Sequence, residues 1–436
     1  MHWISSSDRT YLFKLSLLLL SIIGLVPMVP AQEPPTATAQ TEEVAEVIKQ
    51  LRKQVAELEA RTRELEARLG RGTPEPAAPA AEPVPAGESE VVTLPEVDSV
   101  QDHVGHGGGG LSTPLLQIRG FSDLNYRAST VKGQTNSFAM GQMDLFFNSR
   151  LSDKMNVLAE AVFEADEENE LEFDLERIML QYAVNDYFNF GIGRYHTAIG
   201  YYNTAFHHGT WFQTATGRPF LFAFEDDGGI LPIHNVGVTI NGRIPSGKLG
   251  LNYVAELGNG RASRSKLSEA VQIANDENNG KSFNLGIRSR PPSIPGLQVG
   301  FNVYRDRLTP DGQPRIGQTI WAAHAVYQTP SFEFLNEGVL VRHAISGTNQ
   351  TINTPAFYTQ ISQRFLNRWR PYLRYQYINV PDRDPILNDI GRRHGPSLGI
   401  RYDLGEFAAL KFQYDRTAVR AQRARDAFQL QFAFTF

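Results

Sequence analysis

The chain has 436 residues and a net charge of −5, which is too small and too evenly spread to indicate a nucleic-acid partner. It contains no cysteine, and this excludes disulfides, thiolate metal sites and cysteine nucleophiles. Aromatic residues make up 11% of the chain while the mean hydropathy is −0.31, a combination that argues against an ordinary helix-rich soluble core.

Residues 1–31 have the layout of a secretory signal peptide. Arg9 and Lys14 precede an apolar stretch from Leu15 to Val29, and small residues allow cleavage after Ala31. A membrane anchor is the alternative, but about 15 apolar residues interrupted by proline are short for a spanning helix. We therefore expect an exported protein. Because no later segment is apolar enough for a transmembrane helix, any later membrane crossing has to use strands.

Residues 42–70 carry a heptad pattern. Apolar residues recur at alternating spacings of four and three from Val44 to Leu69, with Thr62 as the one polar position, and Gly70 and Gly72 end the pattern. About four heptads are marginal for an isolated coiled coil. The pattern predicts a short periplasmic coiled coil that forms between chains already held together by another domain. The alternative is a single solvated helix.

Residues 71–114 are predicted to form a linker, because they begin rich in Pro and Ala and end in HVGHGGGG. His103 and His106 could bind a metal ion, but a glycine-rich joint is the preferred interpretation.

Residues 115–436 alternate apolar and polar side chains throughout. Segments such as KMNVLAEAVFE and ALKFQYDR suit strands that cross a bilayer at a tilt, and the connections between them alternate short and long. We predict an all-β, antiparallel transmembrane barrel of about 16 strands in the bacterial outer membrane, with both ends in the periplasm. A soluble β-sandwich is the alternative, but it would not explain the aromatic residues at strand ends, where membrane barrels have girdles.

The last segment, FQLQFAFTF, is predicted to close the barrel. Its alternation directs Phe428, Leu430, Phe432, Phe434 and Phe436 to lipid, and Gln429, Gln431 and Thr435 to the lumen. An open strand edge is not stable in lipid, so this strand has to pair with the first one, near Gln117 to Arg127.

The same alternation of lipid-facing and lumen-facing residues predicts which charged side chains line the lumen. Arginine outnumbers lysine by 27 to 6 after residue 114, and the excess of inward arginines on later strands predicts a basic wall and a preference for anions. The alternative is that these arginines only pair with lumenal acids. The predicted inward basic residues are Arg177, Arg243, Arg288, Arg290, Arg342, Arg364, Arg370, Arg374 and Arg401, and the predicted inward acids are Asp123, Asp144, Glu160, Glu164 and Glu256.

The longest connection, from Tyr195 to about Pro232, is too apolar to lie in water. It is predicted to fold into the lumen and narrow the pore, with Trp211, His207 and His208 in the loop and Glu225, Asp226 and Asp227 opposite the basic wall. His196, His207, His208 and His234 lie near these acids in sequence, which raises a metal site as an alternative. Their spacing matches no compact ligand motif, so we predict no metal and no cofactor.

Catalysis is not expected, because the chain has no GxSxG, no HExxH and no phosphate-binding glycine loop with its lysine. Taken together, these features resemble a trimeric Gram-negative porin, and most closely the phosphate-selective porin superfamily and its dicarboxylate-porin-like relatives with an N-terminal coiled coil. In the phosphate-binding members a ladder of Arg and Lys has few acids around it, whereas Asp144, Glu160 and Glu164 interrupt such a wall here.

The resemblance implies a homotrimer, contact with outer-membrane lipid, and Phe436 as an assembly signal for the barrel-insertion machinery. The expected function is passive diffusion of small hydrophilic, anionic solutes through an Arg-lined lumen. The alternative function is a structural anchor that links the barrel to peptidoglycan or a partner through the coiled coil.

Overall fold

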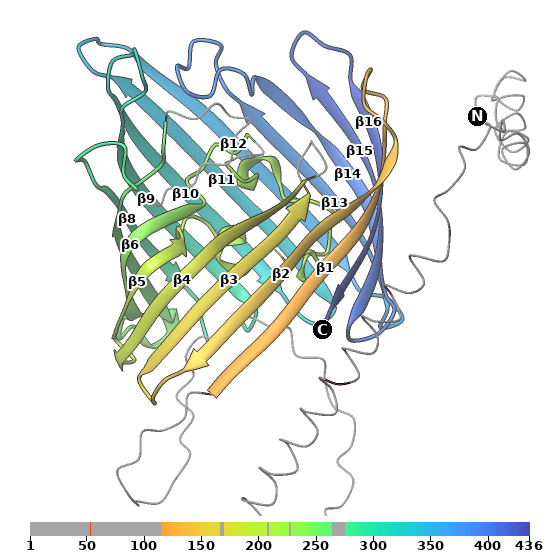
Figure 1. Cartoon of the computed structure of the whole chain (residues 1–436), viewed down its shortest axis with the longest axis horizontal. Coiled ribbons are helices and arrows are strands. Elements are labelled where there is room, and N and C mark those ends of the chain that lie inside the picture. Colours follow the sequence, from red (N-terminus) through yellow and green to blue (C-terminus); the bar gives the residue numbers. More distant parts are fainter. Residues whose placement is uncertain (1–52, 54–114, 166–169, 207–208, 226–227, 264–274) are drawn as a thin grey trace, which may run out of the picture. The chain divides into compact units, whose positions relative to one another are not determined.

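The computed structural model describes residues 53, 115–165, 170–206, 209–225, 228–263 and 275–436. Sixteen antiparallel strands form a closed ring in which each strand pairs with its sequence neighbours and β1 pairs with β16 (Figure 1). The strands are β1 Leu115–Ser129, β2 Ser137–Arg150, β3 Met155–Ala165, β4 Leu171–Asn185, β5 Phe188–His196, β6 His234–Arg243, β7 Leu251–Gly258, β8 Ser282–Ser289, β9 Leu297–Leu308, β10 Ile316–Gln328, β11 Phe332–Ile345, β12 Thr351–Gln363, β13 Trp369–Asn379, β14 Arg392–Asp403, β15 Ala408–Val419 and β16 Arg425–Thr435. The predicted strand number and antiparallel topology are confirmed.

Burial alternates along the strands as the sequence phase predicts. On β9, for example, Val299 and Phe301 are exposed while Gln298 and Asn302 are buried. A barrel with this pattern presents its apolar side chains to lipid and its polar ones to the interior. Among the described residues, no helix has the length and apolarity to cross a membrane. The predicted signal peptide, coiled coil and linker lie outside the described residues.

The barrel closes where the terminal strand was predicted to pair. Phe121 to Ser129 of β1 lie opposite Thr435 to Ala427 of β16. Phe428 and Phe432 are exposed, whereas Gln431 and Ala433 are buried, as the alternation of the terminal segment predicts.

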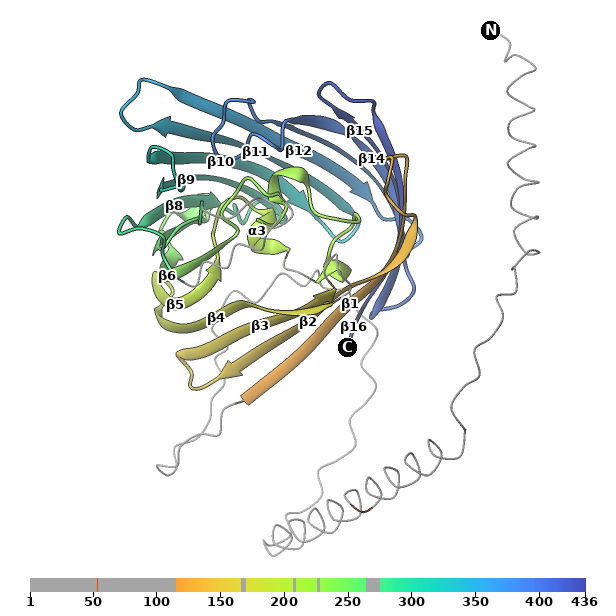
Figure 2. The same cartoon turned by 45° about the horizontal axis from the view of Figure 1, so that its top comes forward.

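Residues 197–233 connect β5 to β6 and are called the inner loop here; those of them that the structure describes lie inside the ring of strands (Figure 2). They contain α3 Tyr202–Ala205 and the short 3-10 helices η1 Thr210–Phe212 and η2 Phe220–Phe222. Apolar side chains of the loop pack against the inner faces of β9 to β13 in one core, which includes Ile199, Tyr202, Leu221, Phe222, Ile230, Tyr304, Leu335, Val339 and Tyr358. The prediction that this apolar connection folds inward is confirmed.

The inner loop reaches two separate parts of the wall. Phe212 of η1 lies 4.7 Å from Phe121 of β1, measured between ring centroids. The backbone N–H of Phe220, at the start of η2, donates to the Gln376 side chain of β13 at 3.0 Å. The loop begins at the end of β5, and β13 lies eight strands from β5 in the ring of sixteen, so the loop crosses the interior to the opposite wall.

Candidate functional site

The candidate site is the surface between the inner loop and the barrel wall. On one side, basic side chains of β13 to β15 donate to backbone carbonyls of the loop. Arg374 donates to the Gly217 carbonyl at 3.1 Å, and Arg401 donates to the Gln213 carbonyl at 3.0 Å and also to the carbonyl of Trp211. Lys411, whose exposure is 0%, donates to the Thr210 carbonyl and to Gln431. The strict alternation of these strands directs the three cations inward.

On the other side, carboxylates and an amide hold the beginning of the loop. Glu337 of β11 accepts hydrogen bonds from the backbone N–H groups of Tyr201 and Tyr202, at 2.5 and 2.9 Å. Glu256 of β7 accepts from the Ala198 N–H at 3.0 Å, and Asn302 of β9 donates to the Ala198 carbonyl at 2.6 Å. The carboxylates of the wall thus accept hydrogen bonds from backbone N–H groups of the loop, and the basic and amide side chains of the wall donate to backbone carbonyls of the loop.

Buried acids gather on the wall formed by β2, β3 and β4. Asp144 and Glu160 are exposed by only 2% and 0%, and Arg177 forms an ion pair with Glu160. Gln142 donates to Glu164 on the same wall. Arg177 is therefore paired with an acid. This is the alternative stated above, in which a lumenal arginine pairs with a lumenal carboxylate instead of attracting anions.

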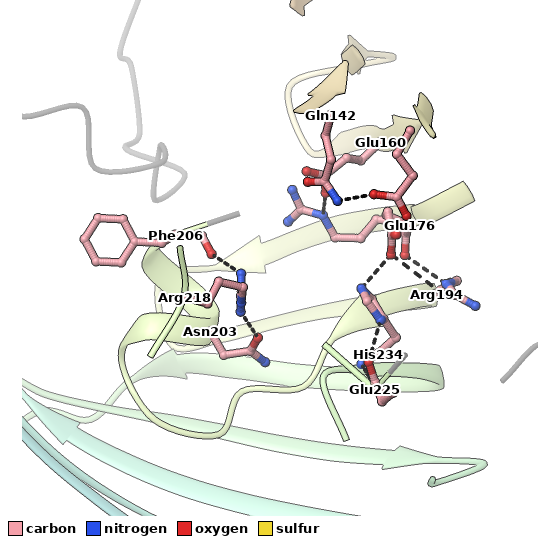
Figure 3. A network of polar contacts seen from close by, with 11 residues as sticks. Gln142, Glu160, Glu176, Arg194, Asn203, Phe206, Arg218, Glu225 and His234 are labelled. Atoms are coloured by element: carbon pink, nitrogen blue, oxygen red, sulfur yellow. Dashed lines mark hydrogen bonds and ion pairs between the residues drawn. The ribbon is translucent and has the colours of Figure 1, made fainter. Parts of the chain in front are cut away.

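Glu225 differs from its predicted place opposite the basic wall. It is buried and accepts hydrogen bonds from the His234 N–H at 3.0 Å and from His234 Nδ1 at 3.3 Å (Figure 3). Burial alone would raise the pKa of the Glu225 carboxyl, but the charge and hydrogen bonds of His234, together with Arg261, outweigh it and lower that pKa. Glu225 is therefore an ionised partner of His234 at the end of the inner loop.

The other predicted loop residues are described in part. Trp211 is half-buried, and the Arg401 guanidinium lies 5.7 Å from the centre of its ring. His207, His208, Asp226 and Asp227 lie outside the described residues.

The remaining predicted arginines differ in their burial and direction. Arg374 and Arg401 are buried, and Arg288, Arg290, Arg364 and Arg370 are half-buried. Arg243 is exposed at the short-turn end, with its Nη1 3.6 Å from Asp186. The inward direction predicted for Arg342 is wrong: it is exposed and in phase with exposed Leu340, while its neighbour His343 has an exposure of 0%. Near the long-loop end a strand leaves the apolar layer, so a charge on the outer face is no longer costly there.

Sequence reasoning missed three residues that hold the inner loop. The side chains of Glu337 and Lys411 face the interior of the barrel. Lys411 lies between the outward-facing Leu410 and Phe412, so the alternation of the strand could have predicted its inward direction. Arg218 lies within the loop and donates to the Phe206 carbonyl at 3.4 Å and to Asn203 at 3.3 Å (Figure 3). No sequence signal identified Arg218, because its partners are set by the fold of the loop itself.

No protein-family model matches the chain, and no curated protein matches its sequence. Solved structures match it along most of its length. The outer membrane channel DcaP of Acinetobacter baumannii is 12% identical, with a TM-score of 0.52 and coverage of 76% of this chain and 99% of that chain. The chain has the fold of outer-membrane porins.

Two further structures show the same similarity. An anion-selective porin from Comamonas acidovorans is 11% identical, with a TM-score of 0.52 and coverage of 74% of this chain and 100% of that chain. The trimer form of OmpT, an outer membrane protein of Vibrio cholerae, is 11% identical, with a TM-score of 0.51 and coverage of 74% and 99%. The predicted resemblance to porins is confirmed for the barrel.

Proposed function

We propose that the protein is a passive channel in the bacterial outer membrane for small hydrophilic solutes. The observation that carries this proposal is a closed 16-stranded ring with a long loop folded against its inner face. An apolar outer face suits lipid, a polar interior suits water and solutes, and the inner loop sets the narrowest section. The shared fold with outer-membrane porins supports the same function.

Anions are the preferred solutes in this proposal. Arg374 donates to a backbone carbonyl and to the Gln360 side chain rather than to a carboxylate, and these neutral acceptors do not cancel its positive charge. On the same side Arg364 and Arg401 share one carboxylate, that of Asp403, whereas on the β2–β4 wall Arg177 is paired with Glu160. The two walls therefore differ in net charge, and a cationic wall lowers the energy of an anion in the constriction.

We also propose that the short-turn end faces the periplasm and that three barrels assemble. The first is supported by the even number of strands, which places both ends of the barrel on one side, and by the short periplasmic turns that are general in outer-membrane barrels. The trimer form of OmpT supports the second. Insertion by the barrel-assembly machinery, with Phe436 as its signal, and periplasmic contact with peptidoglycan remain part of this proposal.

Planar-bilayer recording tests the channel and its selectivity together. Under a salt gradient, the wild type is expected to give discrete conductance steps and a zero-current potential of the sign for anion preference. Arg370→Gln removes an inner-face charge 3.4 Å from Thr214 of the loop and is expected to move that potential toward zero. The control Lys154→Gln, at an exposed turn, should leave it unchanged.

Each contrary outcome refutes a different part of the proposal. A zero-current potential of the sign for cation preference contradicts the basic-wall argument but keeps the channel. Absence of conductance from correctly folded barrels contradicts the channel itself.

A further inference from the structure

Three buried side chains from three adjacent strands converge where the inner loop joins the wall. They are Glu176 of β4, His196 at the end of β5 and His234 at the start of β6, with exposures of 7%, 8% and 5%. One ligand atom from each lies within 4.8 Å of those of the other two. We call them the His–His–Glu cluster, and the proposed channel function does not use it.

The two histidines are placed together by strand pairing. His196 and His234 are directly opposite each other in the β5–β6 register, so their side chains leave the same face of the sheet. Their ring centroids are 4.8 Å apart, with an angle of 68° between the ring planes. Since both residues are the last pair before the inner loop, the cluster sits at the point where the loop leaves the wall and returns to it.

A β-bulge supplies the carboxylate. On β4, Arg177 lies opposite Glu160 and Leu175 lies opposite Ala161, so Glu176 has no opposite residue on β3. A bulge of this kind redirects a side chain that strict alternation would place elsewhere. Arg194 Nε donates to the Glu176 carbonyl at 2.9 Å and so holds the bulge in place.

A second carboxylate orients one imidazole. Glu225 accepts from His234 Nδ1 at 3.3 Å, while His234 Nε2 lies 2.6 Å from the Glu176 carboxylate (Figure 3). A carboxylate on the far nitrogen of a histidine is the usual support of a metal-bound imidazole, because it fixes the tautomer and makes the other nitrogen a better ligand.

We propose that the His–His–Glu cluster binds a divalent transition-metal ion of the Zn²⁺ type, through one nitrogen of each histidine and a carboxylate oxygen of Glu176. Two imidazoles and one carboxylate, with a fourth position for water, are a donor set that zinc uses in proteins. An ion-pair network of Glu176, Arg194, His234 and Glu225 is the competing explanation. The metal site differs from that network in using a second imidazole, that of His196, whose ligand atom lies within 4.8 Å of those of Glu176 and His234.

Binding requires a small local rearrangement. With bonds of about 2.1 Å, a tetrahedral ion holds its ligand atoms roughly 3.4 Å apart. The widest separation in the cluster, which is within 4.8 Å, therefore closes by up to about 1.4 Å. A metal ion binds the neutral imidazole, so His234 Nε2 carries no proton when the ion is bound, and binding is expected to weaken in acid. Once bound, the ion joins β4 to both ends of the inner loop and fixes the loop at its base.

Zinc titration of the full-length protein in detergent, without a histidine tag, tests the proposal. We expect one tight Zn²⁺ equivalent per chain, which His196→Gln and Glu176→Gln each remove. Glu225→Gln keeps all three ligands and is expected to weaken binding about 10- to 100-fold. The control His324→Gln alters a buried histidine of β10 whose partner is Gln298, and it should retain the equivalent.

Two further readouts separate a metal site from a structural role of the same residues. Cobalt bound to the wild type is expected to show the intense visible absorption of a tetrahedral site, and heat-modifiable gel mobility verifies that each variant is folded. Failure of the wild type to bind a tight equivalent overturns the proposal without any variant. It is also overturned if folded His196→Gln binds as much Zn²⁺ as the wild type, or if cobalt shows only the weak absorption of an octahedral ion.

Discussion

Gly120 decides how the last residue fits into the barrel. Its N–H donates to the Phe436 carbonyl at 2.8 Å, and the Phe436 N–H donates back to the Gly120 carbonyl at 2.9 Å. A Cβ on residue 120 would come within 2.2 to 2.7 Å of ring atoms of Phe436. The phenyl ring therefore occupies the space that a side chain would take, and glycine in a strand often marks such a close approach.

Gly120→Val should therefore impair closure of the barrel. The ring of Phe436 has to move, and because it is 64% exposed the cost is expected to stay below the roughly 1 to 3 kcal/mol of overpacking in a closed core. We expect a lower yield of folded barrel on refolding into detergent, measured by heat-modifiable mobility, with unchanged conductance of the channels that do form.

The matched control is Gly317→Val on β10. A Cβ at residue 317 meets nothing nearer than the Ala344 carbonyl at 3.9 Å, and the residue is exposed on the lipid-facing phase. If both variants refold equally well, the ring of Phe436 does not constrain closure. An assembly signal at Phe436 would show separately, as a loss of yield for Phe436→Ala in cells but not on refolding.

At the scale of single elements, the short helix α3 depends on a carboxylate from another strand. Glu337 receives the N–H groups of Tyr201 and Tyr202 at the start of this helix and also the Tyr358 hydroxyl, at 2.7 Å. The first N–H groups of any helix have no partner within it, so an external acceptor has to satisfy them. Glu337 supplies two acceptors from the wall to a helix of four residues.

Glu337→Gln tests whether this contact holds the inner loop. One carboxylate oxygen becomes an amide N–H₂ that faces backbone donors, and a buried donor left without an acceptor costs about 1 to 3 kcal/mol. We expect noisier, larger conductance steps, because the loop leaves the wall more often, and a lower temperature of unfolding. Glu172→Gln, at an exposed position of β4, is the control; equal current noise in both variants would contradict the role of Glu337.

The elements differ in how far the sequence predicts them. Strands were predictable because lipid enforces a strict alternation, and the terminal FQLQFAFTF shows it without interruption. Lipid no longer enforces this alternation outside the apolar layer, which is why the inward direction predicted for the Arg342 side chain was wrong. The contacts of Arg374, Lys411 and Glu337 were not predictable, because their partners are backbone groups of a loop more than 100 residues away in sequence. Glu337 and its partner Tyr201, for example, are separated by 136 residues in the sequence.

At the scale of the whole molecule, the barrel wall and the inner loop stabilise each other. The loop buries Tyr304, Tyr358 and Leu335 of the wall, and the wall satisfies the polar backbone of the loop. The residues that make these contacts all belong to 115–436. We therefore expect conduction to depend on residues 115–436 alone, and the predicted heptads of residues 42–70 to affect only the association of chains.

Deletion of residues 42–72 distinguishes a channel from a structural anchor. A channel is expected to keep its conductance per barrel, because the wall and the inner loop are intact, while fewer trimers survive dilution in detergent, because linked weak contacts act through effective concentration. Bilayer recording measures the first effect, and chemical cross-linking measures the second. A deletion of similar length within residues 73–114 controls for shortening of the segment. If the heptad deletion abolishes conductance while the barrels still fold, residues 115–436 are not sufficient for the channel. If the barrels never conduct and the deletion changes only their attachment to the cell wall, the protein is a structural anchor.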